Sequence, residues 1–254
     1  MRISAQAFHA PKAGNQESEY EDALCPEVPL IGEKGSVFRF AVGDGATETS
    51  FARIWAKQLV RAFCKGKLEG DEFPLSMRSL RERWLKFVSK KAMPWYMEEK
   101  VRSGAFAAVV GLALHDSTEG DEEGMWRALA IGDCCVFQVR RRKLVTSFPI
   151  QSSCQFNSSP LLLSSRGALD QDDSQAILTM CGTWRKGDAF YLMSDAVACW
   201  FLTQVEKGRV PSRELQDLSP NKGEDFDSWL ASLREHKAIR NDDVTVLRIE
   251  IEQD

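Results

Sequence analysis

The amino-acid sequence predicts an α+β fold built on antiparallel sheets. Short apolar runs come in pairs separated by polar turns, at 105–110 with 126–131 and at 135–140 with 143–148, as in β-hairpins. The segments with helical periodicity are grouped along the chain instead of alternating with single strands, which argues against a doubly wound parallel sheet. We therefore expect hairpin-rich sheets with helices packed against them.

The first third of the chain predicts strands around a polar loop, followed by a helix. An apolar run at 37–42 predicts a strand, which we expect Gly43-Asp44-Gly45 to end. Apolar residues then recur at helical spacing from Phe51 to Phe63, and Gly66 follows as a helix-ending residue. The elements expected before this strand are, in chain order, a strand over 3–8, a polar loop over 11–20, a candidate strand over 21–24 and a turn over 27–36.

The middle of the chain predicts helices, the two hairpins and an irregular segment. Helical spacing covers 75–91, and Pro94 suits the first turn of a second helix over 94–101. From about 151 to 182 the chain becomes rich in serine and loses periodicity. We interpret this segment as a flap over or beside a site, with a surface loop of no particular role as the alternative. No linker or repeat divides the chain, so a single domain over 1–254 is expected.

The last quarter predicts two strands separated by helices. An apolar run at 189–193 predicts a strand, and apolar spacing after Asp195 predicts a helix that ends at Gly208. Residues 211–223 are polar and are expected to form a loop. Asp225 is expected to cap a further helix, and 244–249 to form the final strand.

Acidic residues recur at the ends of the predicted strands. Three apolar runs are followed by a small residue and then an aspartate, namely Asp44, Asp133 and Asp195. In the last strand the order is reversed, because Asp242-Asp243 precede it. If that strand is antiparallel to the others, its leading acids meet their trailing acids at one sheet end. A single aspartate of this kind is more often a turn former, but carboxylates crowded together need cations between them.

Composition narrows the chemistry that such a cluster can support. The net charge of −4 and the ordinary proportions of hydrophobic and charged residues give no reason to expect nucleic acid or a membrane as partner. Neither a secretory signal nor a membrane span is recognisable, so a cytoplasmic protein is expected. The seven cysteines lack a metal-binding spacing, and none of the three histidines adjoins an aspartate turn. Oxygen ligands alone favour Mg²⁺ or Mn²⁺ over zinc.

The order of these motifs resembles that of the metal-dependent PPM-type (2C-like) protein serine/threonine phosphatases of bacterial type. The resemblance extends over about residues 10 to 250 and implies a four-layer α-β-β-α sandwich with metals at one end. The motifs that carry it are Glu21-Asp22-Ala23, Val42-Gly43-Asp44-Gly45, the 104–110 strand, Ile131-Gly132-Asp133, Leu192-Met193-Ser194-Asp195 and Asp242-Asp243-Val244-Thr245.

The resemblance also implies a reaction and a role for each matching residue. Two Mn²⁺ or Mg²⁺ ions activate a water that hydrolyses phosphoserine or phosphothreonine in a protein substrate. Asp44 is implied to bridge both ions, with Gly45 offering its carbonyl oxygen, and Asp44 and Asp22 are the implied catalytic residues. A monomer is expected. The remaining implied roles are Asp195 and Asp242 as ligands of one ion, Asp22 and Glu21 as contacts of metal-bound water, and Asp133 as a ligand of a third, weaker ion.

Some positions depart from the family pattern. Glu17 stands where the family usually has an arginine for the substrate phosphate, and Lys12 is the candidate substitute from the same loop. The other departures are Ala196 for a glycine, Cys134-Cys135 for serine and arginine, and Ala46 for a histidine of eukaryotic members. Two alternatives to an active phosphatase therefore stay open. One is a pseudophosphatase that acts as a binding or regulatory module, and the other is a structural domain whose aspartates only form turns.

Overall fold

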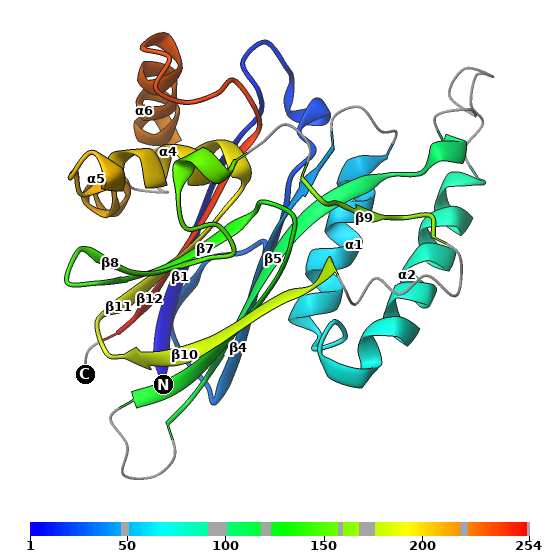
Figure 1. Cartoon of the computed structure of the whole chain (residues 1–254), viewed down its shortest axis with the longest axis horizontal. Helices are drawn as coiled ribbons and strands as arrows, with labels where there is room; N and C mark the ends of the chain where they lie inside the picture. The colour runs from blue at the N-terminus through cyan, green and yellow to red at the C-terminus, as the bar shows by residue number, and fades with distance from the viewer. Residues whose placement is uncertain are drawn as a thin grey trace.

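The computed structural model describes residues 1–46, 51–90, 101–117, 123–156, 160–167, 176–218 and 223–252. Within them the chain forms two antiparallel sheets that pack face to face (Figure 1). The first sheet has the order β3 (Leu30–Lys34), β1 (Arg2–Ala10), β12 (Val244–Ile251), β11 (Asp188–Met193), β7 (Cys135–Arg140) and β8 (Lys143–Phe148). The second has the order β10 (Leu178–Arg185), β6 (Glu123–Ile131), β5 (Phe106–His115), β4 (Val37–Gly45) and β2 (Ala23–Cys25), and β9 (Leu163–Ser164) also pairs with β5.

Helices cover the outer face of each sheet, so the predicted four layers are confirmed. Figure 1 shows α1 (Ala52–Cys64) and α2 (Phe73–Val88) on one side of the sandwich. The helices α4 (Asp195–Glu206), α5 (Pro211–Asp217) and α6 (Gly223–Glu235) lie on the other side. Each of the three interfaces between layers has its own cluster of buried apolar side chains.

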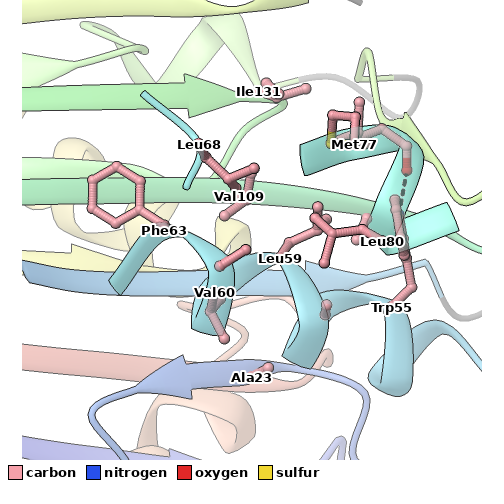
Figure 2. Close-up of a cluster of buried hydrophobic side chains, with 14 of the residues drawn as sticks. Ala23, Trp55, Leu59, Val60, Phe63, Leu68, Met77, Leu80, Val109 and Ile131 are labelled. Atoms are coloured by element: carbon pink, nitrogen blue, oxygen red, sulfur yellow. Dashed lines mark hydrogen bonds between the residues drawn. The ribbon is translucent and has the colours of Figure 1, made fainter. Parts of the chain in front are cut away.

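The amphipathic pattern of α1 explains how it attaches to the second sheet. Leu59, Val60 and Phe63 of the helix belong to the same buried apolar cluster as Val109 of β5 (Figure 2). The indole nitrogen of Trp55 donates a hydrogen bond of 2.8 Å to the backbone oxygen of Leu163 in β9. Because these side chains are almost fully buried, α1 is fixed on the sheet directly after the strand that carries Asp44.

Both predicted hairpins are confirmed, and 135–140 with 143–148 match β7 and β8 residue for residue. The last strand is antiparallel to β11, as the argument from the acidic residues required. The helix expected over 94–101 falls outside the described residues except at its last residue.

Four expectations about local structure were wrong. Residues 27–36 contain β3, because this edge strand pairs with β1. Gly43-Asp44-Gly45 stays within β4, because β5 continues to pair with it as far as Gly45 opposite Ala107. Residues 211–217 form α5, which begins with Pro211 in its first turn. Asp225 does not cap α6, because that helix already begins at Gly223.

The segment interpreted as a flap is shorter than 151–182. Residues 178–182 belong to β10, which pairs with β6 along its whole length. Residues 153–155 form a short 3-10 helix next to α4, where Glu206 accepts hydrogen bonds from Ser152 and Ser153. Phe106 and Ala107 pair with β9, at the end of β5 that β6 does not reach. The described parts of this segment therefore contact helix α4 and strands β5 and β6.

Candidate metal centre

Four of the predicted aspartates lie at or next to strand ends on the same end of the sandwich. Ala23 pairs with Gly43, so the neighbouring residues Asp22 and Asp44 lie side by side in the second sheet. In the first sheet Cys135 pairs with Met193, and Asp133 and Asp195 each lie two residues beyond that pair. Antiparallel pairing thus brings together residues that are far apart in sequence.

Asp242 and Asp243 precede β12 and lie at the same end of the sandwich, because β12 is antiparallel to β1 and β11. Val244, the first residue of β12, pairs with Ala10 at the end of β1. Asp243 is buried, and its two carboxylate oxygens accept hydrogen bonds from the backbone nitrogens of Lys12 at 2.8 Å and Glu21 at 2.6 Å. Asp243 therefore fixes the loop that delivers Glu21-Asp22. The sequence analysis gave it no role, although its place beside Asp242 in the motif was visible.

Asp22 is buried with only part of its hydrogen-bonding capacity used. Its side chain is 1% exposed, and its Oδ2 accepts a hydrogen bond of 2.6 Å from the hydroxyl of Thr245. Its Oδ1 has no hydrogen-bond partner among the described residues. Burial, together with the charges of Asp243 and Asp195, raises the pKa of Asp22 to about 8, against the effect of the hydrogen bond from Thr245.

The other carboxylates raise one another's pKa in the same way. Burial raises the pKa of Asp44 well above its usual value, and Asp22, Asp195, Asp133 and Asp242 raise it further. Burial and the charge of Asp195 raise the pKa of Asp133 to about 7. The pKa of Asp195 is also raised, chiefly by burial, although Arg240 opposes the shift. The structure thus places all four neighbours close enough to act electrostatically on Asp44.

Gly45 allows this crowding because it has no side chain. A Cβ atom there would lie 2.8 Å from the backbone oxygen of Glu21 and 2.9 Å from the backbone carbon of Ala52. Either distance is too short for a real contact. Only a glycine at this position of β4 allows the loop with Glu21 and the start of α1 to approach so closely. The backbone of Gly45 is thereby held beside the carboxylate cluster.

The donor chemistry of the cluster fits a hard divalent cation. All its side chains offer carboxylate oxygens, Asp22 has a buried oxygen without a partner among the described residues, and burial and mutual repulsion raise the pKa values of Asp22 and Asp44. In the part of the chain that the structure describes, no three acidic, histidine or cysteine side chains are arranged as a ready set of ligands. One cation does contact the cluster, because Arg240 forms ion pairs with Asp195 and Asp242. Sequence reasoning missed this arginine.

Lys12, Glu21 and Glu17 all come from the loop before β2, and their surroundings differ. Lys12 is partly buried, and its backbone nitrogen rather than its ammonium group makes the contact with Asp243. Glu21 is partly buried next to Asp22. The side chain of Glu17 is 61% exposed and lies 3.6 Å from both His9 and Arg53. Arg53 of α1 therefore faces the position where the resemblance implied an arginine.

Solved structures of other proteins share this architecture, although comparisons of sequence found no match. No family model matches the chain, and no curated protein matches it in sequence. The serine/threonine phosphatase PstP/Ppp of Mycobacterium tuberculosis is similar in structure, with a TM-score of 0.59 and 14% identity over 100% of both chains. The catalytic domain of PstP in complex with two manganese ions has a TM-score of 0.56 and 12% identity, over 99% of this chain and 100% of that one.

RsbX in complex with magnesium is also similar, with a TM-score of 0.52 and 16% identity, over 99% of this chain and 96% of that one. Among the described residues, no helix has the length and apolar character needed to cross a membrane. The chain thus has the fold of the PPM-type (2C-like) serine/threonine phosphatases, with two antiparallel sheets between layers of helices.

Proposed function

We propose that this chain is a Mn²⁺- or Mg²⁺-dependent phosphatase of protein phosphoserine and phosphothreonine. The observation that carries the proposal is the gathering of buried carboxylates around Asp44 at one end of the sandwich. Burying several acids together is costly unless cations neutralise them. The fold shared with serine/threonine phosphatases supports the same conclusion, as do the manganese and magnesium complexes of two similar structures.

In this proposal Asp44 and the backbone oxygen of Gly45 would hold the ions. Such ions, when bound, supply an activated water and stabilise the charge that develops on a phosphoryl group. The assignments outside the centre are Asp195 and Asp242 to one ion, Asp22 and Glu21 to the water around the ions, and Asp133 to a third, weaker ion.

Two further residues serve proton transfer and substrate binding in this proposal. The Oδ1 of Asp22, which has no hydrogen-bond partner among the described residues, is the atom that accepts a proton once bound ions have driven this carboxyl to its ionised form. Lys12, from the loop that Asp243 anchors, offers its ammonium group to the substrate phosphate. A phosphorylated protein is the substrate class, and the enzyme acts as a monomer in the cytoplasm.

The test is hydrolysis of p-nitrophenyl phosphate and a phosphothreonine peptide with millimolar Mn²⁺. We expect turnover that EDTA abolishes and that Asp44→Asn lowers roughly a hundredfold or more, because several kcal/mol of transition-state stabilisation depend on the ions. Asp227→Asn is the matched control, since Asp227 is exposed on α6 and should leave the rate unchanged. Full activity in Asp44→Asn, or no turnover of either substrate, contradicts the proposal.

A second candidate is a metal-binding module without turnover. The acidic Glu17 at the implied phosphate position and the arginine already paired with Asp195 and Asp242 favour it. Calorimetric Mn²⁺ binding combined with no hydrolysis of either substrate would identify this case. Ordinary turnover would exclude it.

A further inference from the structure

Arg240 lies at the edge of the carboxylate cluster and contacts two of its members. One guanidinium nitrogen, Nη2, donates to Oδ2 of Asp195 and lies 3.1 Å from Oδ2 of Asp242. The side chains of Asp195 and Asp242 are 10% and 29% exposed, whereas that of Arg240 is 55% exposed. A single nitrogen atom is therefore shared between two carboxylates, with solvent on the other side of the guanidinium.

The backbone around Arg240 is held in place independently of this contact. Arg234 of α6 donates hydrogen bonds to the backbone oxygens of Asp242 at 2.8 Å and Pro11 at 2.9 Å. Ile239, the residue before Arg240, is buried in the core beneath α4 and α6. The loop is thus anchored on both sides of Arg240, so its long side chain can leave the carboxylates without moving the backbone.

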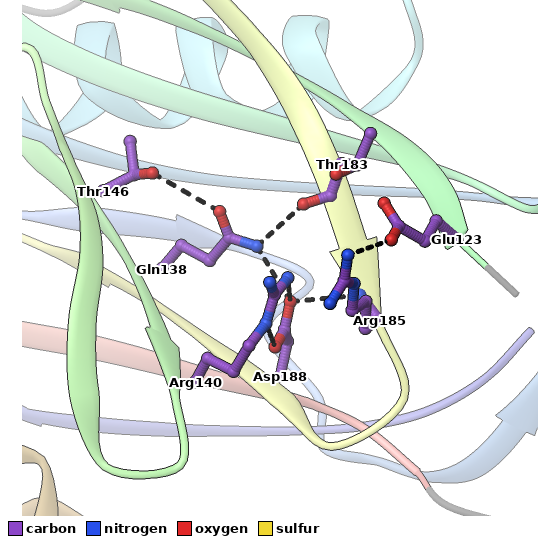
Figure 3. Close-up of polar contacts among 7 residues, drawn as sticks. All are labelled: Glu123, Gln138, Arg140, Thr146, Thr183, Arg185 and Asp188. Atoms are coloured by element: carbon purple, nitrogen blue, oxygen red, sulfur yellow. Dashed lines mark hydrogen bonds and ion pairs between the residues drawn. The ribbon is translucent and has the colours of Figure 1, made fainter.

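A second ion pair in this chain shows what a purely structural arginine contact looks like. At the opposite end of the first sheet, Arg140 binds Asp188 with two nitrogens, each at 2.7 Å (Figure 3). Asp188 is fully buried, and it also accepts hydrogen bonds from the side chain of Gln138 and the backbone of Arg185. That carboxylate has all its partners within the protein. Asp195 and Asp242, by contrast, share one exposed guanidinium.

We propose that Arg240 is a built-in counter-ion that occupies the place of a divalent cation between Asp195 and Asp242. The inference rests on the proposed function, which assigns these two carboxylates to one ion. The guanidinium and an ion would compete for the same Oδ2 atoms, and two cations a few ångströms apart repel each other. An entering ion must therefore displace Arg240, and its apparent affinity is reduced by the fraction of molecules in which Arg240 is paired.

Calorimetric titration of the metal-free chain with Mn²⁺ tests the inference directly. Arg240→Gln should bind Mn²⁺ roughly tenfold more tightly than the unmodified chain, the change expected when nine molecules in ten lose the competing pair. Arg185→Gln is the matched control. Its arginine is 56% exposed, pairs with Glu123 away from the cluster, and carries the same charge (Figure 3). It should leave the Mn²⁺ affinity unchanged.

Thermal unfolding distinguishes competition between Arg240 and Mn²⁺ from a purely structural role of Arg240. Without metal, Arg240→Gln should melt below the unmodified chain, because two carboxylates lose their shared cation. Saturating Mn²⁺ should remove that difference. An arginine with a merely structural role would lower the melting temperature equally with and without Mn²⁺, and that result would overturn the inference.

The outcomes also separate this inference from the proposed function. Equal Mn²⁺ affinity in Arg240→Gln and the unmodified chain overturns the role of Arg240, even if Mn²⁺-dependent hydrolysis is present. Equal tightening in Arg185→Gln overturns it as well, since the effect would then follow from net charge. If no variant binds Mn²⁺, both the role of Arg240 and the proposed metal centre fail.

Discussion

Replacing Asp22 with asparagine should stabilise the metal-free protein while weakening its stabilisation by metal. Asparagine has the shape of a protonated aspartate, and its side-chain oxygen can still accept the hydrogen bond from Thr245. It carries no charge, so it neither loses solvation on burial nor repels Asp44. The substitution therefore removes the cost that raises the pKa of Asp22 in the folded chain.

The size of the effect follows from the two pKa values of Asp22. Folding raises the pKa from 3.8 to about 8, so the folded state binds a proton that the unfolded state has lost. The stability of the metal-free chain is therefore full below about pH 4 and falls as the pH rises towards 8. Each pH unit in that interval costs about 1.4 kcal/mol for one such group. At pH 8 Asp22→Asn should thus be more stable than the unmodified chain by several kcal/mol, and near pH 4 by almost nothing.

Urea unfolding of both proteins in EDTA, at pH 5 and at pH 8, measures this difference. A second series with saturating Mn²⁺ should stabilise the unmodified chain more than Asp22→Asn, because the variant lacks one carboxylate around the ions. The reasoning is refuted if the metal-free unmodified chain is as stable at pH 8 as at pH 5. It is also refuted if Asp22→Asn is the less stable protein at pH 8.

Three more outcomes follow from the same contacts. Mn²⁺ binding at pH 6 should release protons from Asp22 and Asp133, because the pKa values of both carboxyls are raised in the metal-free chain. The calorimetric heat of binding should therefore change with the ionisation enthalpy of the buffer. Equal heats in buffers of different ionisation enthalpy would contradict the raised pKa values. Asp243→Ala should weaken Mn²⁺ binding about tenfold in the same titration, because the loop before Asp22 loses two anchors. Asp188→Ala should cost about 1–3 kcal/mol in urea unfolding, because the side chain of Gln138 and the backbone nitrogen of Arg185 lose a buried acceptor, and an altered Mn²⁺ affinity would show that the two sheet ends are not independent.

The sequence was sufficient to predict the elements whose pattern is set by burial. Strands such as β7 and β8 lie between turns with strong local signals, so their bounds could be predicted to the residue. The antiparallel last strand then implied that Asp242 and Asp195 lie at one edge. Each of these steps needs only side-chain periodicity and strand direction.

The errors arose where a neighbouring segment decides the local structure. β3 is short and half exposed, so its strand character depends on pairing with β1. Gly43-Asp44-Gly45 has the composition of a turn, yet the partner strand β5 keeps it extended. Arg240 could not be assigned to the cluster from the sequence, because a long side chain in a loop has no periodicity to indicate its direction. Tertiary contacts override local preference at all three places.

The position of β12 has a consequence for the newly made chain. This last strand lies between β1 and β11, so it joins two parts of the first sheet that are otherwise separate. That sheet cannot close until β12 has left the ribosome, because synthesis proceeds from the N-terminus. Asp242 and Asp243 directly precede this strand. A nascent chain therefore holds an incomplete carboxylate cluster until β12 and the two acids before it have been synthesised.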